Sequence, residues 1–283
     1  MDKQLKTELK INAVKVRMGI IESVYNAKCG HPGGSLGLAD TLTYLYTAKM
    51  KVSLANPTEK NRDRFVLSKG HNAPVLYSVL ALAGFFPAEE LKTLRKIDSR
   101  LQGHPVMGKI PGVDMSTGSL GQGISAACGM ALAGKLDGAP YRVYTALGDG
   151  EIQEGQVWEA AMFAAHYKLD NLVAVIDNNN LQIDGKITDV MSPYPIDEKF
   201  RAFGWQVINI DGHDFEQIEA AFNQAEKVSG KPVAIIQKTT KGKGVSFMED
   251  KASWHGAAPN EEQYKTAMSE LQSQLDEIMK EGA

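Results

Sequence analysis

The segment that decides the fold is residues 141–185, YRVYTALGDGEIQEGQVWEAAMFAAHYKLDNLVAVIDNNNLQIDG. Residues 141–147 and the apolar run 172–176 have the character of strands, and the stretch between them has the character of a helix. Strands joined through a helix lie parallel in one sheet, so their carboxyl ends meet at the same edge. Asp149 and Asn179 follow these two ends and are therefore expected to lie side by side.

The polar groups expected at this edge suit a hard divalent cation that carries a diphosphate. Mg²⁺ prefers oxygen ligands in octahedral geometry and usually completes its shell with phosphate oxygens. Asp149 offers a carboxylate and Asn179 an amide oxygen, while Gly150 lets the backbone approach a phosphate closely. Two unrelated turns would also contain such residues. The strand before each of them, their spacing and the IDG sequence at 183–185 favour a metal site, which Ca²⁺ or Mn²⁺ could also occupy.

The rest of the chain alternates between strand and helix patterns. Further strands are expected at 65–68, 205–210 and 232–239, and helices at 5–24, 38–50, 73–83, 158–167, 214–228 and 260–280. This alternation is typical of an α/β fold with a doubly wound, mostly parallel sheet flanked by helices. Since the 283 residues contain no repeat or low-complexity linker, we expect a single domain spanning 1–283.

Composition and charge argue against several classes of protein. The net charge is −3 and no basic cluster occurs, so nucleic acid is not an expected partner. The amino terminus lacks the apolar core of a signal peptide, and no apolar run reaches the roughly 18 residues of a membrane span. We therefore expect a cytoplasmic protein without membrane association. Cys29 and Cys128 lack metal-ligand or redox spacing and are expected to remain reduced, without a disulfide.

Five of the six histidines stand next to glycine, and four of these lie in the motifs GHPG, SKGH, GHP and WHG, namely His31, His71, His104 and His255. A single such histidine would most simply be a surface residue in a turn, but four in one chain favour positioned side chains. Imidazole suits proton transfer near neutral pH, and imidazolium attracts phosphate. His166 lies within a predicted helix as a packing or surface residue, and His213 is expected at most to cap the start of a helix.

Two further glycine-containing segments give weaker signals. The segment 116–123, STGSLGQG, leads into small residues at 125–134 that would allow close packing of a neighbouring helix or subunit. It lacks the Lys-Ser/Thr of a P-loop and the strand-turn-helix placement of a dinucleotide fingerprint, so neither is assigned. The segment 241–244, KGKG, is expected to be a solvated, mobile loop rather than a cover over a site near His255.

These motifs together resemble the amino-terminal, diphosphate-binding domain of transketolases, which are thiamine diphosphate enzymes. GHPGGSLG, SKGH, GHP, PGVDMSTGSLGQG, LGDGEIQEGQVWEA, DNNNLQIDG and WHG occur in the order and approximate spacing of that family, over residues 10–260. Two positions depart from its pattern: Cys29 stands where serine is common, and Val106 where an acidic residue often stands. These departures concern contacts to the substrate rather than the cofactor site.

The resemblance implies a role for each matched position. The implied metal ligands are Asp149, Asn179 and the Leu181 carbonyl oxygen. The implied diphosphate contacts are His71, Gly150 and Asn179, and the implied backbone contacts to the aminopyrimidine are Gly118 and Leu120. The implied sugar-facing residues are His31, His104 and His255. Of these, His31 and His255 would assist proton movements at the donor hydroxyls, and His255 would also lie near the cofactor. Glu154 and Glu159 resemble glutamates near the dimer interface of the family.

A full-length transketolase continues into a pyrimidine-binding domain, which holds the glutamate that activates the cofactor, and a carboxyl-terminal domain. The resemblance therefore implies a chain that is inactive alone and is completed by a separate carboxyl-terminal transketolase subunit in an α2β2 hetero-oligomer. The complete enzyme would transfer a two-carbon ketol unit from a ketose phosphate to an aldose phosphate. The alternatives are 1-deoxyxylulose-phosphate synthesis, oxidative decarboxylation of a 2-oxo acid, a non-catalytic cofactor-binding module, or a piece of a longer enzyme. The physiological sugar stays open.

Overall fold

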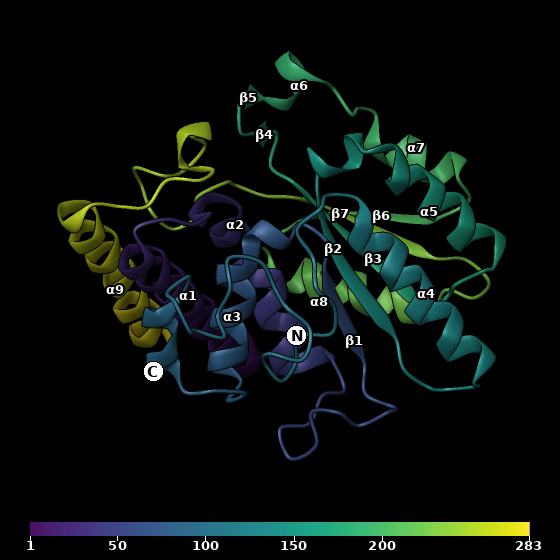
Figure 1. The fold of residues 1–283 in the computed structure, drawn as a ribbon, viewed down its shortest axis with the longest axis horizontal. Coiled ribbons are helices and arrows are strands. Elements are labelled where there is room, and N and C mark those ends of the chain that lie inside the picture. Colours follow the sequence, from purple (N-terminus) through teal and green to yellow (C-terminus); the bar gives the residue numbers. More distant parts are fainter. Residues whose placement is uncertain (283) are drawn as a thin grey trace.

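In the computed structural model, which describes residues 1–282, the chain is built on a parallel sheet of five strands in the order β1-β2-β3-β7-β6 (Figure 1). These strands are β1 (Arg64–Leu67), β2 (Val143–Gly148), β3 (Leu172–Asn178), β6 (Gln206–Asp211) and β7 (Val233–Lys238). All neighbouring pairs in this sheet are parallel. A short antiparallel hairpin, β4 (Leu181–Gln182) with β5 (Gly185–Lys186), follows β3. The predicted parallel α/β fold is confirmed.

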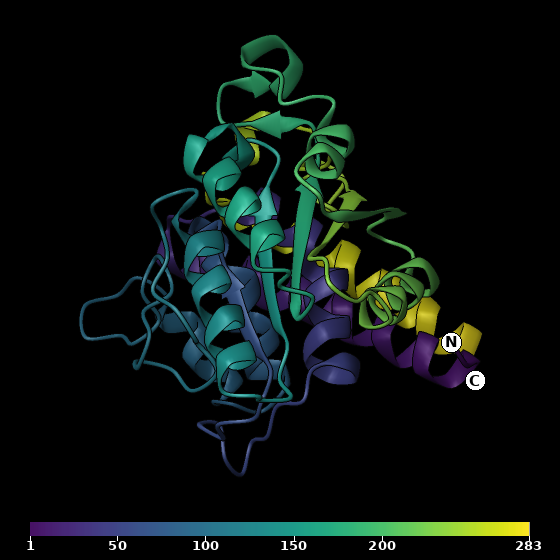
Figure 2. The same cartoon turned by 90° about the vertical axis from the view of Figure 1, so that its right-hand side faces the viewer.

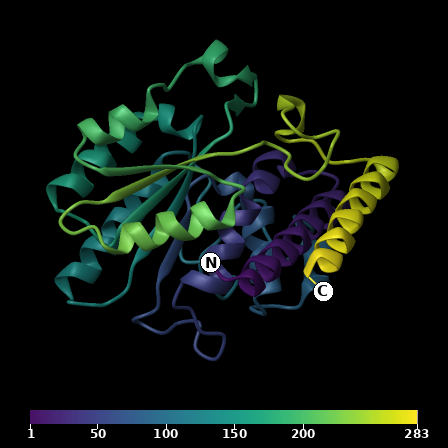
Figure 3. The same cartoon turned by 180° about the vertical axis from the view of Figure 1, so that it is seen from behind.

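Helices cover both faces of the sheet. One face is covered by α1 (Lys3–Ala27), α2 (Pro32–Tyr44), α3 (Ala73–Leu82) and α8 (Phe215–Glu226). The other is covered by α4 (Gln122–Leu136), α5 (Gly155–His166) and α7 (Ile196–Ala202). The last helix, α9 (Glu261–Gly282), packs along α1 at the outer edge of its layer (Figure 3). The hairpin and α6 (Ile187–Val190) project beyond the end of the sheet (Figure 2).

The strands in the middle of the sheet are apolar because helices cover both of its faces. In β3, Val173 and Val175 pack in the core that α1, α2, α3 and α8 share, whereas Ala174 and Ile176 pack in the core under α4, α5 and α7. Successive side chains of a strand point to opposite faces, so a strand between two helix layers must be apolar throughout. In β3 the polar residues, Asp177 and Asn178, therefore stand only at the carboxyl end of the strand.

The start of α2 differs from the prediction. The helix predicted at 38–50 begins earlier in the structure, because α2 starts at Pro32 and is followed by a π-helical turn, Leu45–Lys49. Proline suits a first helical turn, where its missing N–H has no helical partner to lose. A Cβ on Gly33 would lie 2.8 Å from the Trp254 carbonyl oxygen, and one on Gly37 would lie 2.9 Å from that of Thr240. These glycines therefore allow another segment to pack against the helix.

Several smaller predictions can be compared directly with the structure. His166 is exposed at the end of α5, as expected. The prediction that His213 caps a helix is wrong, because the N-cap of α8 is Asp214, whose side chain accepts hydrogen bonds from the backbone N–H groups of Glu216 and Gln217. Cys29 and Cys128 are both free. Within residues 1–282, no helix combines the length and the apolar character needed to cross a membrane.

Candidate functional site

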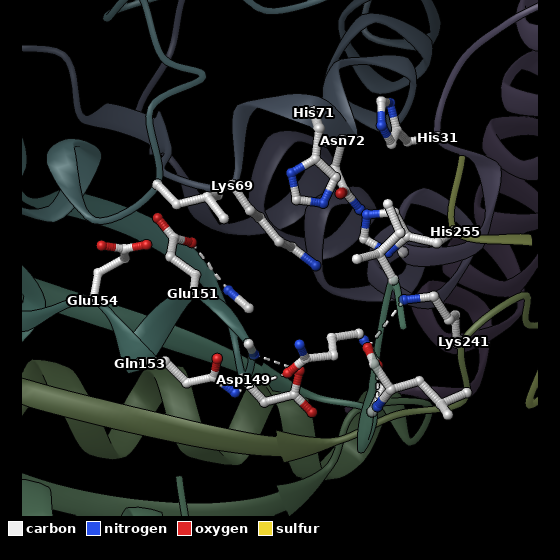
Figure 4. Close-up of a pocket in the computed structure, with 18 of the residues that line it drawn as sticks. His31, Lys69, His71, Asn72, Asp149, Glu151, Gln153, Glu154, Lys241 and His255 are labelled. Carbon is white, nitrogen blue, oxygen red and sulfur yellow. Dashed lines mark hydrogen bonds between the residues drawn. The ribbon is translucent and has the colours of Figure 1, made fainter. Parts of the chain in front are cut away.

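A cavity of about 340 Å³ opens at the carboxyl edge of the sheet (Figure 4). Its volume lies near the lower end of the range of about 300–1,000 Å³ for small-molecule sites. Gly148 pairs with Asp177 across β2 and β3, so the residues after these strands reach the same edge, as predicted. The predicted site residues that line the cavity are His31, His71, Gly118, Leu120, Asp149, Gly150, Asn179, Leu181 and His255.

His104 is the predicted site residue that does not line this cavity. Its side chain is exposed and lies behind the Gly118 backbone, where a Cβ on Gly118 would come within 3.1 Å of the His104 ring. Partial shielding of the His104 ring from water by its neighbours, followed by the charge of Arg95, lowers its pKa. His104 therefore lies at the rim, one loop farther out than the other predicted histidines.

Asp149 provides a buried carboxylate with little compensating charge. It is 2% exposed, and its oxygens accept hydrogen bonds from the backbone N–H groups of Gly150 at 2.9 Å and Asn180 at 2.5 Å. Burial, followed by the charge of Asp177, raises the pKa of Asp149 to about 6. A cation beside this carboxylate would remove that penalty, since an opposite charge favours the ionised form.

Asp177, by contrast, already has a cationic partner. It is fully buried, forms an ion pair with Lys69 and accepts a hydrogen bond from the Thr239 hydroxyl. Burial alone would raise the pKa of Asp177, but Lys69 and Thr239 hold it below its usual value. Asp177 also accepts from the Asn179 side-chain nitrogen at 3.3 Å, while the Asn179 side-chain oxygen accepts from the Leu181 N–H at 3.1 Å. These two contacts fix the orientation of the Asn179 amide.

The prediction of a solvated loop at 241–244 is wrong for Lys241. This side chain is 2% exposed, and its ammonium group donates to the Leu181 carbonyl oxygen at 3.1 Å (Figure 4). Burial, followed by the charge of Lys69, lowers the pKa of Lys241 to about 8, so the group is still cationic at neutral pH. The loop is held inward because it follows β7 at the carboxyl edge and packs on the glycines of α2. The sequence did contain a signal for Lys241 as a site residue, because the segment 241–244 follows a predicted strand, and ligands commonly bind at the carboxyl ends of parallel strands.

His31, His71 and His255 form a cluster in which the ring centroids lie 5.1–5.5 Å apart. Burial is the largest cause that lowers the pKa of each ring, to about 4 for His31, to about 3 for His255 and far below the usual value for His71. All three are therefore neutral at pH 7. The expected imidazolium partner for phosphate is absent from this cluster in the protein without ligand, and Lys69 and Lys241 supply positive charge to the cavity instead.

Glu151 is a site residue that sequence reasoning missed. Its side chain is 2% exposed and accepts hydrogen bonds from the Ser68 hydroxyl at 2.5 Å, the Gly121 N–H at 2.9 Å and the Gly148 N–H at 3.1 Å. These donors lie directly after β1, at the start of α4 and at the end of β2, so Glu151 connects three separate segments of the chain. Burial raises the pKa of the Glu151 carboxyl, and the three hydrogen bonds oppose that shift. A glutamate directly after GDG was the available signal.

The cavity contains polar atoms that the protein leaves without partners. Nδ1 of His31, Nδ1 of His255 and both side-chain polar atoms of Asn72 are buried and form no hydrogen bond. Buried polar groups are almost always satisfied, so a polar ligand fits here. Within residues 1–282, no group of three or more His, Cys, Asp or Glu side chains is arranged to hold a metal ion. A cation beside Asp149 would therefore need amide, carbonyl and phosphate oxygens as well, which is the set that Mg²⁺ accepts.

Comparison with known proteins identifies the same family as the sequence motifs do. The family described as "Transketolase, thiamine diphosphate binding domain" matches residues 8–277. The 6-deoxy-6-sulfo-D-fructose transketolase subunit SqwG of Clostridium sp. (strain MSTE9) is 46% identical, with 94% of this chain and 97% of that protein covered. An apulose-4-phosphate transketolase subunit of Phocaeicola vulgatus is 44% identical, with 96% of this chain and 97% of that protein covered.

The solved transketolases agree in fold and are longer. The crystal structure of transketolase from Campylobacter jejuni superposes with a TM-score of 0.89 at 36% identity, over 98% of this chain and 46% of that chain. The chain thus spans less than half the length of this full-length enzyme. The family match, the relatives and the shared fold all point to one family. The chain belongs to the transketolase family of ketol-transferring enzymes, in which it matches the thiamine diphosphate-binding domain.

Proposed function

We propose that this chain is the amino-terminal subunit of a two-chain transketolase, and that it holds Mg²⁺ and the diphosphate of thiamine diphosphate. The observation that carries the proposal is the under-compensated Asp149 carboxylate, which lies at the edge of a cavity containing Lys69 and Lys241. Two relatives that are named transketolase subunits match almost end to end. An α2β2 assembly with a carboxyl-terminal subunit, and a cytoplasmic location, are part of the same proposal.

The metal would be held by the Asp149 carboxylate, the Asn179 side-chain oxygen and the Leu181 carbonyl oxygen. These three groups provide the hard oxygen ligands that Mg²⁺ prefers, and Ca²⁺ or Mn²⁺ could replace it. In the protein without ligand, Lys241 donates to the Leu181 carbonyl. When a cation takes that carbonyl, the Lys241 ammonium group would need a new acceptor, and a diphosphate oxygen supplies one.

The cofactor would extend from this edge toward the loop at 118–121. His71, Gly150 and Asn179 would contact the diphosphate, and the backbone groups of Gly118 and Leu120 would contact the aminopyrimidine. All five residues line the cavity. Thiamine diphosphate, when bound, supplies the carbanion-stabilising centre for breaking and forming the C–C bond in the transfer of a two-carbon ketol unit.

The neutral histidines give the cavity groups that can accept protons. His31 and His255 each leave Nδ1 buried without a protein partner, and burial keeps both rings unprotonated at pH 7. We assign these two rings to proton movement at the hydroxyls of the donor sugar, since a neutral imidazole both accepts and donates. His104, at the rim, would bind the sugar farther from the cofactor.

The partner subunit would pack on the outer face of α4 and α5. Leu136 is 78% exposed, Met162 is 54% exposed, and a Cβ on Gly129 would meet no atom within 4 Å. Exposed apolar and small residues on adjacent helices suit a protein interface. Glu154 and Glu159, at the start of α5, are also exposed, and Glu154 lines the cavity. A partner on this face would therefore reach the cofactor site.

The test is a coupled ketol-transfer assay with xylulose 5-phosphate, ribose 5-phosphate, thiamine diphosphate and Mg²⁺. It is run on this chain alone and on its mixture with a candidate carboxyl-terminal chain. We expect activity only in the mixture, and loss of activity with His31→Gln but not with His166→Gln, the exposed control. Cofactor binding without turnover would support a different donor, acceptor or non-catalytic role. A monomer that persists with partner, cofactor and Mg²⁺ would contradict the hetero-oligomer.

A further inference from the structure

A buried charged cluster lies outside the cavity, where α1, α2 and the end of β6 meet. Arg17 donates to both oxygens of Asp40, at 3.0 and 2.5 Å, and His213 Nδ1 lies 2.7 Å from the same carboxylate. Arg17 is 6% and Asp40 is 4% exposed. Burial alone would raise the pKa of Asp40, but Arg17 and His213 hold it below its usual value. The proposed function has no use for this cluster.

The second ring nitrogen of His213 fixes the tautomer of the ring. Nε2 lies 2.9 Å from the backbone N–H of Thr240, which can only donate. Nε2 must therefore be unprotonated and accept this bond. The ring hydrogen of a neutral His213 then lies on Nδ1 and is donated to Asp40. His213 thus connects a fixed carboxylate on α2 to one backbone group.

That backbone group belongs to residues 239–242, which we call the strap. The strap leaves β7 with a hydrogen bond from the Thr239 N–H to the Asn178 carbonyl at 3.2 Å, and ends with one from the Gly242 N–H to the Gly33 carbonyl at 2.8 Å. Between these two points it carries Lys241, whose ammonium group enters the cavity and reaches the Leu181 carbonyl. The His213 contact holds the residue immediately before Lys241.

We propose that His213, held in turn by Asp40 and Arg17, is a positioning residue that places Lys241 in the cofactor cavity. This inference rests on the proposed function, because it requires that Lys241 binds the diphosphate. Lys241 has a long side chain with many rotamers, and keeping it buried requires its backbone to be fixed. Losing the acceptor of the half-buried Thr240 N–H favours another path for the strap. Cofactor affinity should therefore depend on a residue that does not touch the cofactor.

Two amide substitutions separate the two contacts of His213. The side-chain amide of His213→Gln can place an oxygen near the Nε2 position and keep the Thr240 contact. The shorter side-chain amide of His213→Asn ends near the Nδ1 position. It can therefore keep the Asp40 contact but cannot accept the hydrogen bond from the Thr240 N–H. A residue that served only the stability of the fold would have no reason to favour glutamine over asparagine in cofactor binding. The matched control is His166→Asn on the exposed end of α5.

The measurement is calorimetric titration of thiamine diphosphate with Mg²⁺ into this chain combined with its partner, together with the Tm of each variant. We expect His213→Gln to bind within about threefold of the unsubstituted protein, and His213→Asn to bind at least about tenfold more weakly. In a Lys241→Ala background the His213→Asn loss should disappear, because coupled residues are not additive. Equal losses for the two His213 variants, no loss for His213→Asn, or a full tenfold loss without Lys241 would each overturn the proposal.

A folding defect in a variant and an error in the proposed function can both be distinguished from an error in the role of His213. If His213→Asn does not fold, the His213→Gln protein carries the test, and a tenfold loss of affinity there overturns the proposal. If the unsubstituted complex binds no thiamine diphosphate, the proposed function itself is wrong, which is a different result from equal binding by all His213 variants.

Discussion

Glu151 offers the most direct test of how the loops around the cavity are held. Its carboxylate is 2% exposed and accepts hydrogen bonds from Ser68 after β1, Gly121 at the start of α4 and Gly148 at the end of β2. The change to test is Glu151→Gln, which keeps the shape and one oxygen but replaces the other oxygen with an amino group. Glu151→Ala removes all three acceptors.

The magnitude follows from the donors that each change leaves without an acceptor. In Glu151→Gln the retained oxygen can keep Ser68 and Gly121, so the Gly148 N–H is left facing an NH₂ group. One stranded buried donor costs about 1–3 kcal/mol. In Glu151→Ala the Ser68 hydroxyl can rotate to another acceptor, but two backbone N–H groups are stranded, for a cost of about 2–6 kcal/mol. Because burial raises the pKa of Glu151, removing the charge returns part of this cost.

The assay is urea unfolding of the chain without ligand, with Glu277→Gln as the control. Glu277 is exposed on α9, and such surface substitutions usually change the free energy of unfolding by less than about 0.5 kcal/mol. We expect Glu151→Gln to fall clearly below that control and Glu151→Ala to fall further. If Glu151→Ala, which removes all three acceptors, unfolds within about 0.5 kcal/mol of Glu277→Gln, the three hydrogen bonds do not hold these segments together and the explanation is wrong.

Three other predictions follow from the cavity. Asp149→Ala should abolish Mg²⁺-dependent binding of thiamine diphosphate, whereas His31→Ala should leave binding intact and lower turnover. Calorimetry measures the binding and the transfer assay measures the turnover. Equal losses of cofactor affinity in the two variants would contradict the assigned roles. Lys241→Met removes the charge but keeps most of the side-chain volume, and it should weaken cofactor binding about tenfold or more, since charge-assisted hydrogen bonds contribute about 1.5–3 kcal/mol; unchanged affinity would exclude a diphosphate contact. The pKa of Asp149, raised from 3.8 to about 6, gives a signed pH dependence. Its contribution to the stability of the ligand-free fold is present below pH 3.8 and is lost as the pH rises through about 6. Metal binding needs the carboxylate, so Mg²⁺-dependent affinity should fall about tenfold per pH unit below that value; a flat titration between pH 5 and 7 would contradict this.

The strands and the polar residues at their ends could be predicted because both depend on local sequence. The run at 172–176 is apolar throughout and that at 141–147 is mostly so, as two-sided burial favours, and Asp149 and Asn179 come shortly after them. The segment 30–37 could not be predicted in the same way. Its glycines indicate a turn when only neighbouring residues are considered, but Gly33 and Gly37 lie in α2, where the lack of a side chain allows Trp254 and Thr240, from far along the chain, to pack against the helix.

The charge state of the cavity depends on the same long-range contacts, which explains why sequence reasoning assigned the positive charge to the wrong residues. A lysine in a glycine-rich loop is normally solvated, and a histidine near phosphate is normally a candidate imidazolium. Here Lys69 is held by Asp177, 108 residues away, and Lys241 by the Leu181 carbonyl, 60 residues away. Their buried charges, together with burial itself, keep His71 and His255 neutral. Burial, with the charges of the two lysines added to it, leaves the histidines unprotonated and able to accept protons, and this division of roles exists only after the loops have come together.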